Sequence, residues 1–230
     1  MRKRGTISIS TRRSWVRRIP VVAFAAIAAT LLPASAMAAT ANDTTQFSVT
    51  PGTLVFGTAP DVPVLPPLTL NGQAQTLNAQ MANFAVTDGT GAGSGWNVTV
   101  NGDSTGGNSA VFKQYCPNAT CGSDTGPGYV TSGASLAANS LTLNSTGAGF
   151  TAQNGTTGTP PSHSCNSGCF VDSASAVRVI SAAANAGMGT YQANTYSATS
   201  LALPASSTIK ALQANEVYRV NLVWTLNSGP

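Results

Sequence analysis

Apolar and polar residues alternate along much of the chain with a period of two, which is typical of half-buried β-strands, and helical periodicity is nearly absent. In the clearest case, Trp96, Val98 and Val100 share one face while polar residues lie between them. Many short strands separated by turn residues predict an all-β fold, an antiparallel β-sandwich or a barrel-like domain. The expected strands lie at residues 47–50, 54–56, 84–86, 96–101, 176–180 and 218–226.

Turn and breaker residues divide these strands. Pro51-Gly52 and Asn101-Gly102 are turn signals, and the second is of the hairpin type. Residues 60–67 contain four prolines, which cannot donate to a central strand ladder, so this stretch is expected to form an extended edge or a loop. The alanines at 182–184 are the one place where the pattern favours a short helix.

The first 39 residues have the organisation of a signal peptide. A basic region runs to Arg18, an apolar stretch covers residues 21–32, and overlapping Ala-x-Ala sites follow within residues 34–39. The apolar stretch is shorter than the roughly 20 residues that a membrane span needs, which disfavours the alternative of an uncleaved anchor. Arg12-Arg13 leaves twin-arginine export open beside the general route. We therefore expect a secreted single domain over residues 40–230.

The charge of that domain differs in sign from the charge of the whole chain. Seven of the eleven Lys and Arg residues lie in residues 1–39, which hold none of the seven acidic residues. The remainder has four basic and seven acidic residues, a formal charge of −3 against +4 for the whole chain. Four scattered cations form no basic stripe, so binding to nucleic acid through phosphate neutralisation is excluded. Attachment to an anionic membrane surface is disfavoured on the same ground.

Residues 103–170 are the least regular part and are expected to form long loops and short hairpins. All four cysteines lie there, as the close pairs Cys116 with Cys121 and Cys165 with Cys169. An oxidising compartment predicts two disulfides, for which three pairings exist. A zinc site that combines these thiols with His163 is the alternative, although the spacings match no familiar zinc motif.

Few residues suggest catalysis. His163 is the sole histidine, and a loop histidine exposed to solvent is its simplest interpretation; a hydrolytic triad would need it as the base. Residues 102–107 resemble the nucleophile loop of chymotrypsin-like proteases, but Thr105 interrupts the pattern and the histidine follows it instead of preceding it.

Asp88 lies in a glycine-rich loop and is more typical of a turn than of a calcium site. No spacing singles out a carboxylate pair for glycoside hydrolysis. We expect no enzyme, cofactor or metal.

Two segments, residues 84–98 and 218–230, resemble the two halves of the WxL domain of Gram-positive surface proteins. In that family a Trp motif follows a Val-x-Asp and a glycine-rich turn, and a Tyr…Leu-x-Trp-x-Leu strand closes the chain near a proline. The motif positions here are Trp96 and Val98 upstream and Trp224 and Leu226 downstream. Val98 departs from the family's leucine. The resemblance covers nearly all of residues 46–230 and is weakest in the cysteine-bearing middle.

The resemblance implies non-covalent attachment at the cell surface to the cell wall, specifically to peptidoglycan, often beside partner surface proteins. Trp and Leu two residues apart on a strand face the same side, so the motif either marks the core of the fold or presents rings that stack on sugars. Polar residues on the opposite faces are available for contacts in either case: Asn97, Thr99, Asn221 and Thr225. The alternative function is a structural subunit or adhesin that acts through protein–protein assembly at the cell surface.

Overall fold

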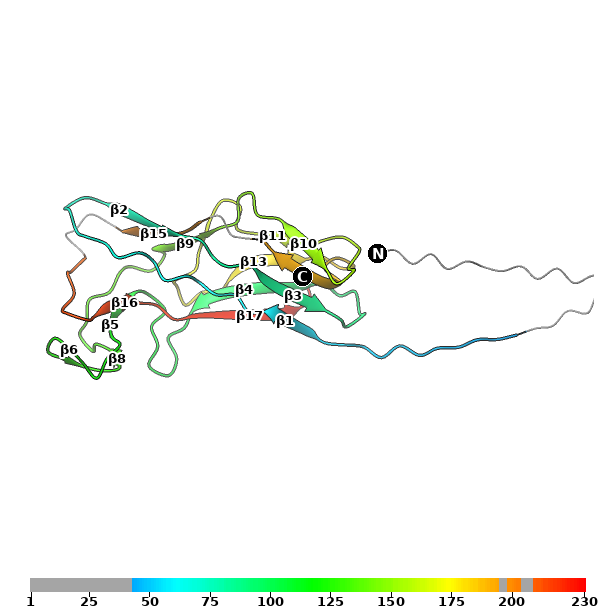
Figure 1. Ribbon diagram of the computed structural model, residues 1–230, viewed down its shortest axis with the longest axis horizontal. Coiled ribbons are helices and arrows are strands. Elements are labelled where there is room, and N and C mark those ends of the chain that lie inside the picture. Colours follow the sequence, from blue (N-terminus) through cyan, green and yellow to red (C-terminus); the bar gives the residue numbers. More distant parts are fainter. Residues whose placement is uncertain (1–42, 195–197, 204–208) are drawn as a thin grey trace, which may run out of the picture. The chain divides into compact units, whose positions relative to one another are not determined.

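Seventeen β-strands make up the regular structure of the part of the chain that the computed structural model describes, residues 43–194, 198–203 and 209–230. Every strand pair there is antiparallel and no helix occurs within those residues, so the predicted all-β fold class is confirmed (Figure 1). In this described part, no helix is long and apolar enough to span a membrane. Residues 48–230 form one compact unit. The expected signal peptide, residues 1–39, lies outside the described residues.

Two four-stranded sheets carry most of the core. The first has the strand order β1-β3-β14-β10 and the second β11-β13-β4-β17. Their strands are β1 (Leu54–Thr58), β3 (Phe84–Asp88), β14 (Gly189–Ala193) and β10 (Phe150–Gln153), then β11 (Ser162–His163), β13 (Val177–Ala182), β4 (Trp96–Gly102) and β17 (Leu222–Ser228). Strands β1 and β17 lie side by side where the two sheets adjoin (Figure 1).

Three further sheets, of four, three and two strands, complete the fold. The third sheet has the order β12-β9-β15-β2, the fourth β16-β5-β8, and the fifth pairs β6 with β7. Their strands are β12 (Cys169–Phe170), β9 (Leu141–Asn144), β15 (Ala198–Leu203) and β2 (Gln75–Ala79), then β16 (Val217–Arg219), β5 (Lys113–Cys116) and β8 (Gly128–Tyr129), and finally β6 (Thr120–Cys121) and β7 (Asp124–Thr125).

The core is built by the alternation that the sequence predicts. Trp96, Val98 and Val100 of β4 are each 0 % exposed. Phe84 and Val86 of β3 face the same cluster of buried residues. Period two places every second side chain inward, which is why these short strands each give two or three residues to one core.

The strand expected at residues 47–50 is wrong. Phe47 is 90 % exposed and Val49 79 % exposed, and β1 begins only at Leu54. Alternation is not sufficient for a strand, because the backbone also needs a neighbouring strand to pair with. Here the first backbone contact with the sheet is made by Gly52, whose N–H donates to the carbonyl of Gly89 at 2.8 Å.

The hairpin turn expected at Asn101-Gly102 is also wrong, because both residues belong to β4. Gly102 serves a different purpose: a Cβ built on it would lie 2.7 Å from the Cα of Ala110. The missing side chain therefore lets the following loop pass against the strand. The pair Asn-Gly permits a turn but does not require one.

The strand expected over residues 218–226 is split into β16 and β17. Strand β16 pairs with β5, whereas β17 pairs with β4. At the break, the N–H of Asn221 donates to the carbonyl of Ser109 and its carbonyl accepts from the N–H of Asp103. The loop after β4 thus takes the backbone bonds that a continuous strand would have given to a neighbouring strand.

The short helix expected at 182–184 is absent from the described residues. Ala182 pairs with Trp96 in the sheet, and a turn follows in which Asn185 adopts a φ of 62°. The N–H of Asn185 donates to the carbonyl of Gly93 at 2.9 Å. Tertiary contacts with the glycine-rich loop therefore override the helical propensity of alanine.

Residues 103–170 match their prediction as short hairpins and loops: the eight strands β5 to β12 are two to four residues long. Both disulfides form between sequence neighbours, Cys116 with Cys121 and Cys165 with Cys169. This local pairing selects one of the three possible arrangements and leaves no free thiol for the zinc alternative.

Asp172 is a structural residue that the alternation pattern does not reveal. It is 0 % exposed, and its carboxylate accepts the backbone N–H groups of Ser140 and Leu141 at 3.0 and 2.8 Å. Burial raises the pKa of Asp172, while these N–H bonds act in the opposite direction. The carboxylate thereby fixes the start of β9 to the segment that follows β12.

Replacing Asp172 by Ala is expected to lower the free energy of unfolding by about 3 kcal/mol, because two buried N–H groups lose their acceptor. Urea denaturation followed by circular dichroism measures the change. Asp61→Ala is the matched control, since Asp61 is exposed and should alter stability by no more than about 0.5 kcal/mol. Equal effects of the two substitutions would contradict the anchoring role of Asp172.

Candidate functional site

The two tryptophan motifs lie on neighbouring strands of one sheet. Strands β4 and β17 pair in register, so that Trp224 lies opposite Val100 and Leu226 opposite Val98. Directly paired residues of antiparallel strands point to the same side of the sheet. The segments 96–98 and 224–226, far apart in the sequence, therefore form one continuous apolar surface.

Trp96 is enclosed in this surface. Its side chain is 0 % exposed, and its Nε1–H donates to the carbonyl of Gly187 at 3.0 Å. A buried indole needs an acceptor for its N–H, and the loop between β13 and β14 supplies one. A ring in this position cannot stack on a sugar without unfolding of the strand.

Glycines line the space around the Trp96 indole. Gly187 has a φ of +70°, and a Cβ built on it would lie 2.6 Å from the Cβ of Ala182 and 2.7 Å from Nε1 of Trp96. Gly95 has a φ of +76°, and a Cβ there would collide with the carbonyl oxygen of Ala182. Glycine is therefore required at 187 by the indole itself and at 95 by the backbone that follows β13.

Trp224 is half-buried. Its ring lies 5.8 Å from the ring of Phe84 on β3, at an interplanar angle of 56°. This tilted contact joins the first sheet to the second and favours the interpretation of the motif as part of the core.

The opposite face of the β4–β17 pair is polar, but its amides are already engaged. Asn97 is only 9 % exposed; its Nδ2 donates to the carbonyl of Gly229 at 2.8 Å and its Oδ1 accepts from Nδ2 of Asn227 at 3.2 Å. Thr99 and Thr225 are paired on the same face. This polar ladder holds the end of β17 against β4.

One comparison with known proteins decides the family. A family model described as WxL domain surface cell wall-binding matches residues 40–230. The chain belongs to the WxL domain family. No curated protein matches the chain, and no solved structure does.

Membership gives the domain a general role. The family is one of cell wall-binding domains at the cell surface and not one of enzymes. The resemblance on the segments 84–98 and 218–230 is thus confirmed at the level of the family, and the register of β4 and β17 explains why two distant motifs belong to one signature.

The structure places His163 of the WxL domain in a packed position, so the expectation of an exposed histidine is wrong. Its ring stacks on Phe150 with the centroids 4.2 Å apart, and its Nε2 lies 3.4 Å from the carbonyl oxygen of Gly149. Burial lowers the pKa of His163, whereas the contact with the Gly149 carbonyl acts in the opposite direction. The stacking gives the ring a structural role between β10 and β11.

Two aspartates act as turn formers. Asp88 accepts hydrogen bonds from the N–H of Thr90 at 3.0 Å and from its hydroxyl at 2.6 Å, which confirms the predicted turn. Asp103 accepts the equivalent pair from Thr105 and a further bond from Asn108. These bonds, led by the Thr105 hydroxyl, lower the pKa of Asp103.

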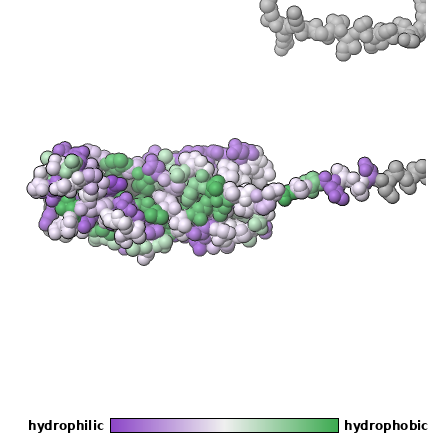
Figure 2. Space-filling model, turned by 90° about the horizontal axis from the view of Figure 1, so that it is seen from below, coloured by the Kyte–Doolittle hydropathy of each residue, from purple (hydrophilic) through white to green (hydrophobic). Residues whose placement is uncertain are grey.

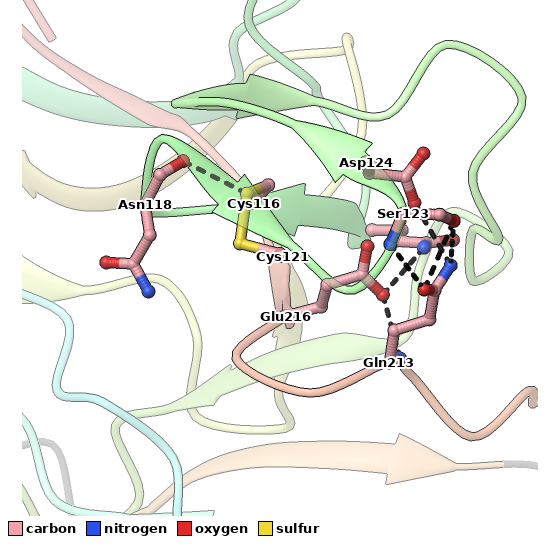
Figure 3. Close-up of a disulfide and its surroundings, with 8 residues drawn as sticks. Cys116, Asn118, Cys121, Ser123, Asp124, Gln213 and Glu216 are labelled. Carbon is pink, nitrogen blue, oxygen red and sulfur yellow. Dashed lines mark hydrogen bonds between the residues drawn. A yellow bond between two sulfur atoms is a disulfide. The ribbon is translucent and has the colours of Figure 1, made fainter.

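The fold also brings together two acids that no sequence spacing singles out. A hydrogen bond with Glu216 raises the pKa of Asp124, and Glu216 accepts from Nε2 of Gln114 and from the N–H of Gln213, both at 2.8 Å. Figure 3 shows the Gln213 side chain reaching Ser123, whose N–H donates to its Oε1 at 2.8 Å. This clasp fastens the disulfide-bonded β6–β7 hairpin to the segment before β16.

Removing either motif tryptophan is expected to destabilise the WxL domain. Trp96→Ala should cost about 3–5 kcal/mol, the usual range for a fully buried aromatic residue, and Trp224→Ala about 2 kcal/mol because its ring is half-buried. Denaturant unfolding measures both. If Trp224→Ala abolished wall binding while its unfolding midpoint stayed unchanged, the ring would belong to a binding surface instead of the core.

The packing at Trp96 is tested separately with glycine substitutions. Gly187→Ala and Gly91→Ala both place a Cβ on a backbone of positive φ, +70° and +67°, but only Gly187 has atoms within 4 Å of that position. We expect Gly187→Ala to be at least about 2 kcal/mol more destabilising, because the clash adds to the shared backbone strain. Equal losses in a thermal unfolding experiment would show that the indole can move aside.

Proposed function

We propose that this WxL domain is exported and attaches non-covalently to the Gram-positive cell wall, with peptidoglycan as the polymer that it recognises. The observation that carries the proposal is the match of the cell wall-binding family over residues 40–230, together with the paired tryptophan strands. The signal-like residues 1–39 supply the route to the surface.

The chemistry of attachment follows from the composition. Beyond residue 39 the chain has four basic residues and a formal charge of −3, so a general attraction between the protein and an anionic wall is excluded. Recognition through local contacts remains, and of these shape, stacking and hydrogen bonding depend only weakly on salt. Both motif tryptophans serve this function indirectly, by holding the sheets together.

A second candidate function is assembly with other surface proteins. It is favoured by apolar side chains that stand in solvent, with Phe47 at 90 %, Val49 at 79 % and Val64 at 95 % exposure. Figure 2, which views the molecule from below, shows further hydrophobic patches separated by polar ones on that face. Scattered apolar residues are ordinary on protein surfaces, so this observation ranks below the family match.

Sedimentation with protein-free peptidoglycan sacculi tests the proposal. The purified protein is expected to sediment with an excess of sacculi and to retain measurable binding in about 1 M NaCl, where the Debye length falls to about 3 Å. Heat-unfolded protein is the control for trapping. A folded protein that stays in the supernatant would overturn wall binding and favour the assembly function.

A further inference from the structure

The end of the domain near β5, β8 and β16 carries a groove that the motif does not involve. Two adjoining hollows of about 560 and 290 Å³ share Gly107, Asn108 and Tyr129 in their walls. They lie between the loop that follows β4 and the small β16-β5-β8 sheet, which Figure 1 shows near the start of β17.

Two tyrosines and two cations share one face of this small sheet. Arg219 lies directly opposite Lys113, and Tyr115 directly opposite Tyr129, in antiparallel pairs. Residues two apart on a strand face the same side, so Lys113 and Tyr115 present their side chains together. The tyrosine rings pack edge to face with centroids 5.0 Å apart, and the guanidinium of Arg219 lies 4.5 Å above the Tyr115 ring.

The paired cations indicate a ligand. Like charges directly opposite each other on neighbouring strands destabilise a sheet. Arg219 and Lys113 are also two of the four basic residues beyond residue 39, in a chain whose formal charge there is −3. Half of the positive charge of this segment is therefore gathered at one groove, where the Lys113 ammonium also reaches the carbonyl of Thr131 at 3.4 Å.

The groove is held in shape before any ligand arrives. The hydroxyl of Tyr129 hydrogen-bonds to Oδ1 of Asn221. The backbone of Asn221 is bonded on both sides to the loop after β4, through Ser109 and Asp103. A preformed site loses little conformational entropy on binding.

We propose that this groove binds a segment of the cell-wall polymer in which a sugar lies beside an anionic group. Aromatic rings stack on sugar faces, amides and hydroxyls pair with sugar hydroxyls, and a guanidinium with an ammonium beside it receives a carboxylate or phosphate. The inference rests on the proposed wall attachment and assigns the contact to this groove. The anionic group has two possible sources: carboxylates of the peptide stems, or phosphates of a polymer linked to the glycan.

The test compares two double variants that remove the same charge. Lys113→Gln with Arg219→Gln alters the groove, whereas Arg178→Gln with Lys210→Gln removes two exposed cations that line neither hollow. Each protein is purified from the producing cells and titrated with intact sacculi at low salt. The groove variant is expected to bind about tenfold more weakly and the control variant within about twofold of the wild type.

Two further readouts separate binding from folding. The melting temperature of the groove variant should change little, because removal of the opposed like charges offsets the loss of the Arg219–Tyr115 contact. In about 1 M NaCl the affinity of the wild type for sacculi should fall to that of the groove variant, since salt screens the ionic contribution to binding. Equal weakening of both double variants, or none in either, would overturn the groove.

A soluble probe distinguishes the failure of the groove from the failure of wall attachment. Disaccharide-peptide fragments from muramidase digestion should shift the ring resonances of Tyr115 and Tyr129 in the wild type but not in the groove variant. If the wild type and the groove variant sediment equally, the proposal of wall attachment stands and the groove is rejected. If the wild type does not sediment, wall attachment is rejected. If, in addition, the fragments cause no ring shifts, the groove is rejected as well.

The source of the anion is identified with the same sacculi. Treatment with hydrofluoric acid cleaves phosphodiesters and removes phosphate-linked polymers. If the wild type still binds treated sacculi more tightly than the groove variant does, the anions are the stem carboxylates. If this difference in affinity disappears, the anions are the phosphates.

Discussion

The pairing of β4 with β17 places Trp96 where water cannot reach it, and the rest of the domain is arranged around the needs of that one indole. Its N–H requires an acceptor, which the carbonyl of Gly187 provides from the loop after β13. Its tight surroundings require glycine at position 187, and the neighbouring position 95 must be glycine because the backbone of Ala182 and Ala183 passes close to it. The end of β17 is fastened in turn, because the N–H of Gly229 donates to the carbonyl of Gly95 at 2.9 Å. The buried ring and the glycine before it thus couple three segments that are distant in the sequence.

This coupling changes what the family signature means. The motif places a Trp two residues before an apolar residue, and it occurs twice. Such a pattern can be interpreted as exposed rings that stack on sugars. In this domain the first ring is 0 % exposed and the second leans on Phe84, so both belong to the contact between two sheets. The signature then identifies a fold, and under our proposal the wall-binding side chains lie on residues that the motif does not include. Membership in a cell wall-binding family and a buried motif are therefore compatible.

The sequence predicts the core of this fold better than its edges. Burial of Val98 and Val100 follows from alternation, because a strand with one apolar face has only one way to be placed. The break at Asn221 does not show in the pattern, since the apolar period continues through it and only the distant Ser109 and Asp103 divert the backbone. The groove is invisible for the same reason: its residues come from β5, β8 and β16, and only strand register brings them together. The position of His163 against Phe150 is likewise a contact between strands, which a single loop sequence does not encode.

The irregular segment 103–131 can be understood as the support of the groove. Cys116 directly follows Tyr115, and its disulfide with Cys121 closes the chain immediately beyond β5. The Gln213 side chain ties the next hairpin to the segment before β16 through Ser123. These links lie in a part of the chain with few buried apolar residues, so they replace the packing that keeps β4 and β17 rigid. Under this proposal a domain of net negative charge can hold an anionic polymer, because a charge acts strongly only within about 8–10 Å at physiological salt and Lys113 and Arg219 lie at the groove itself.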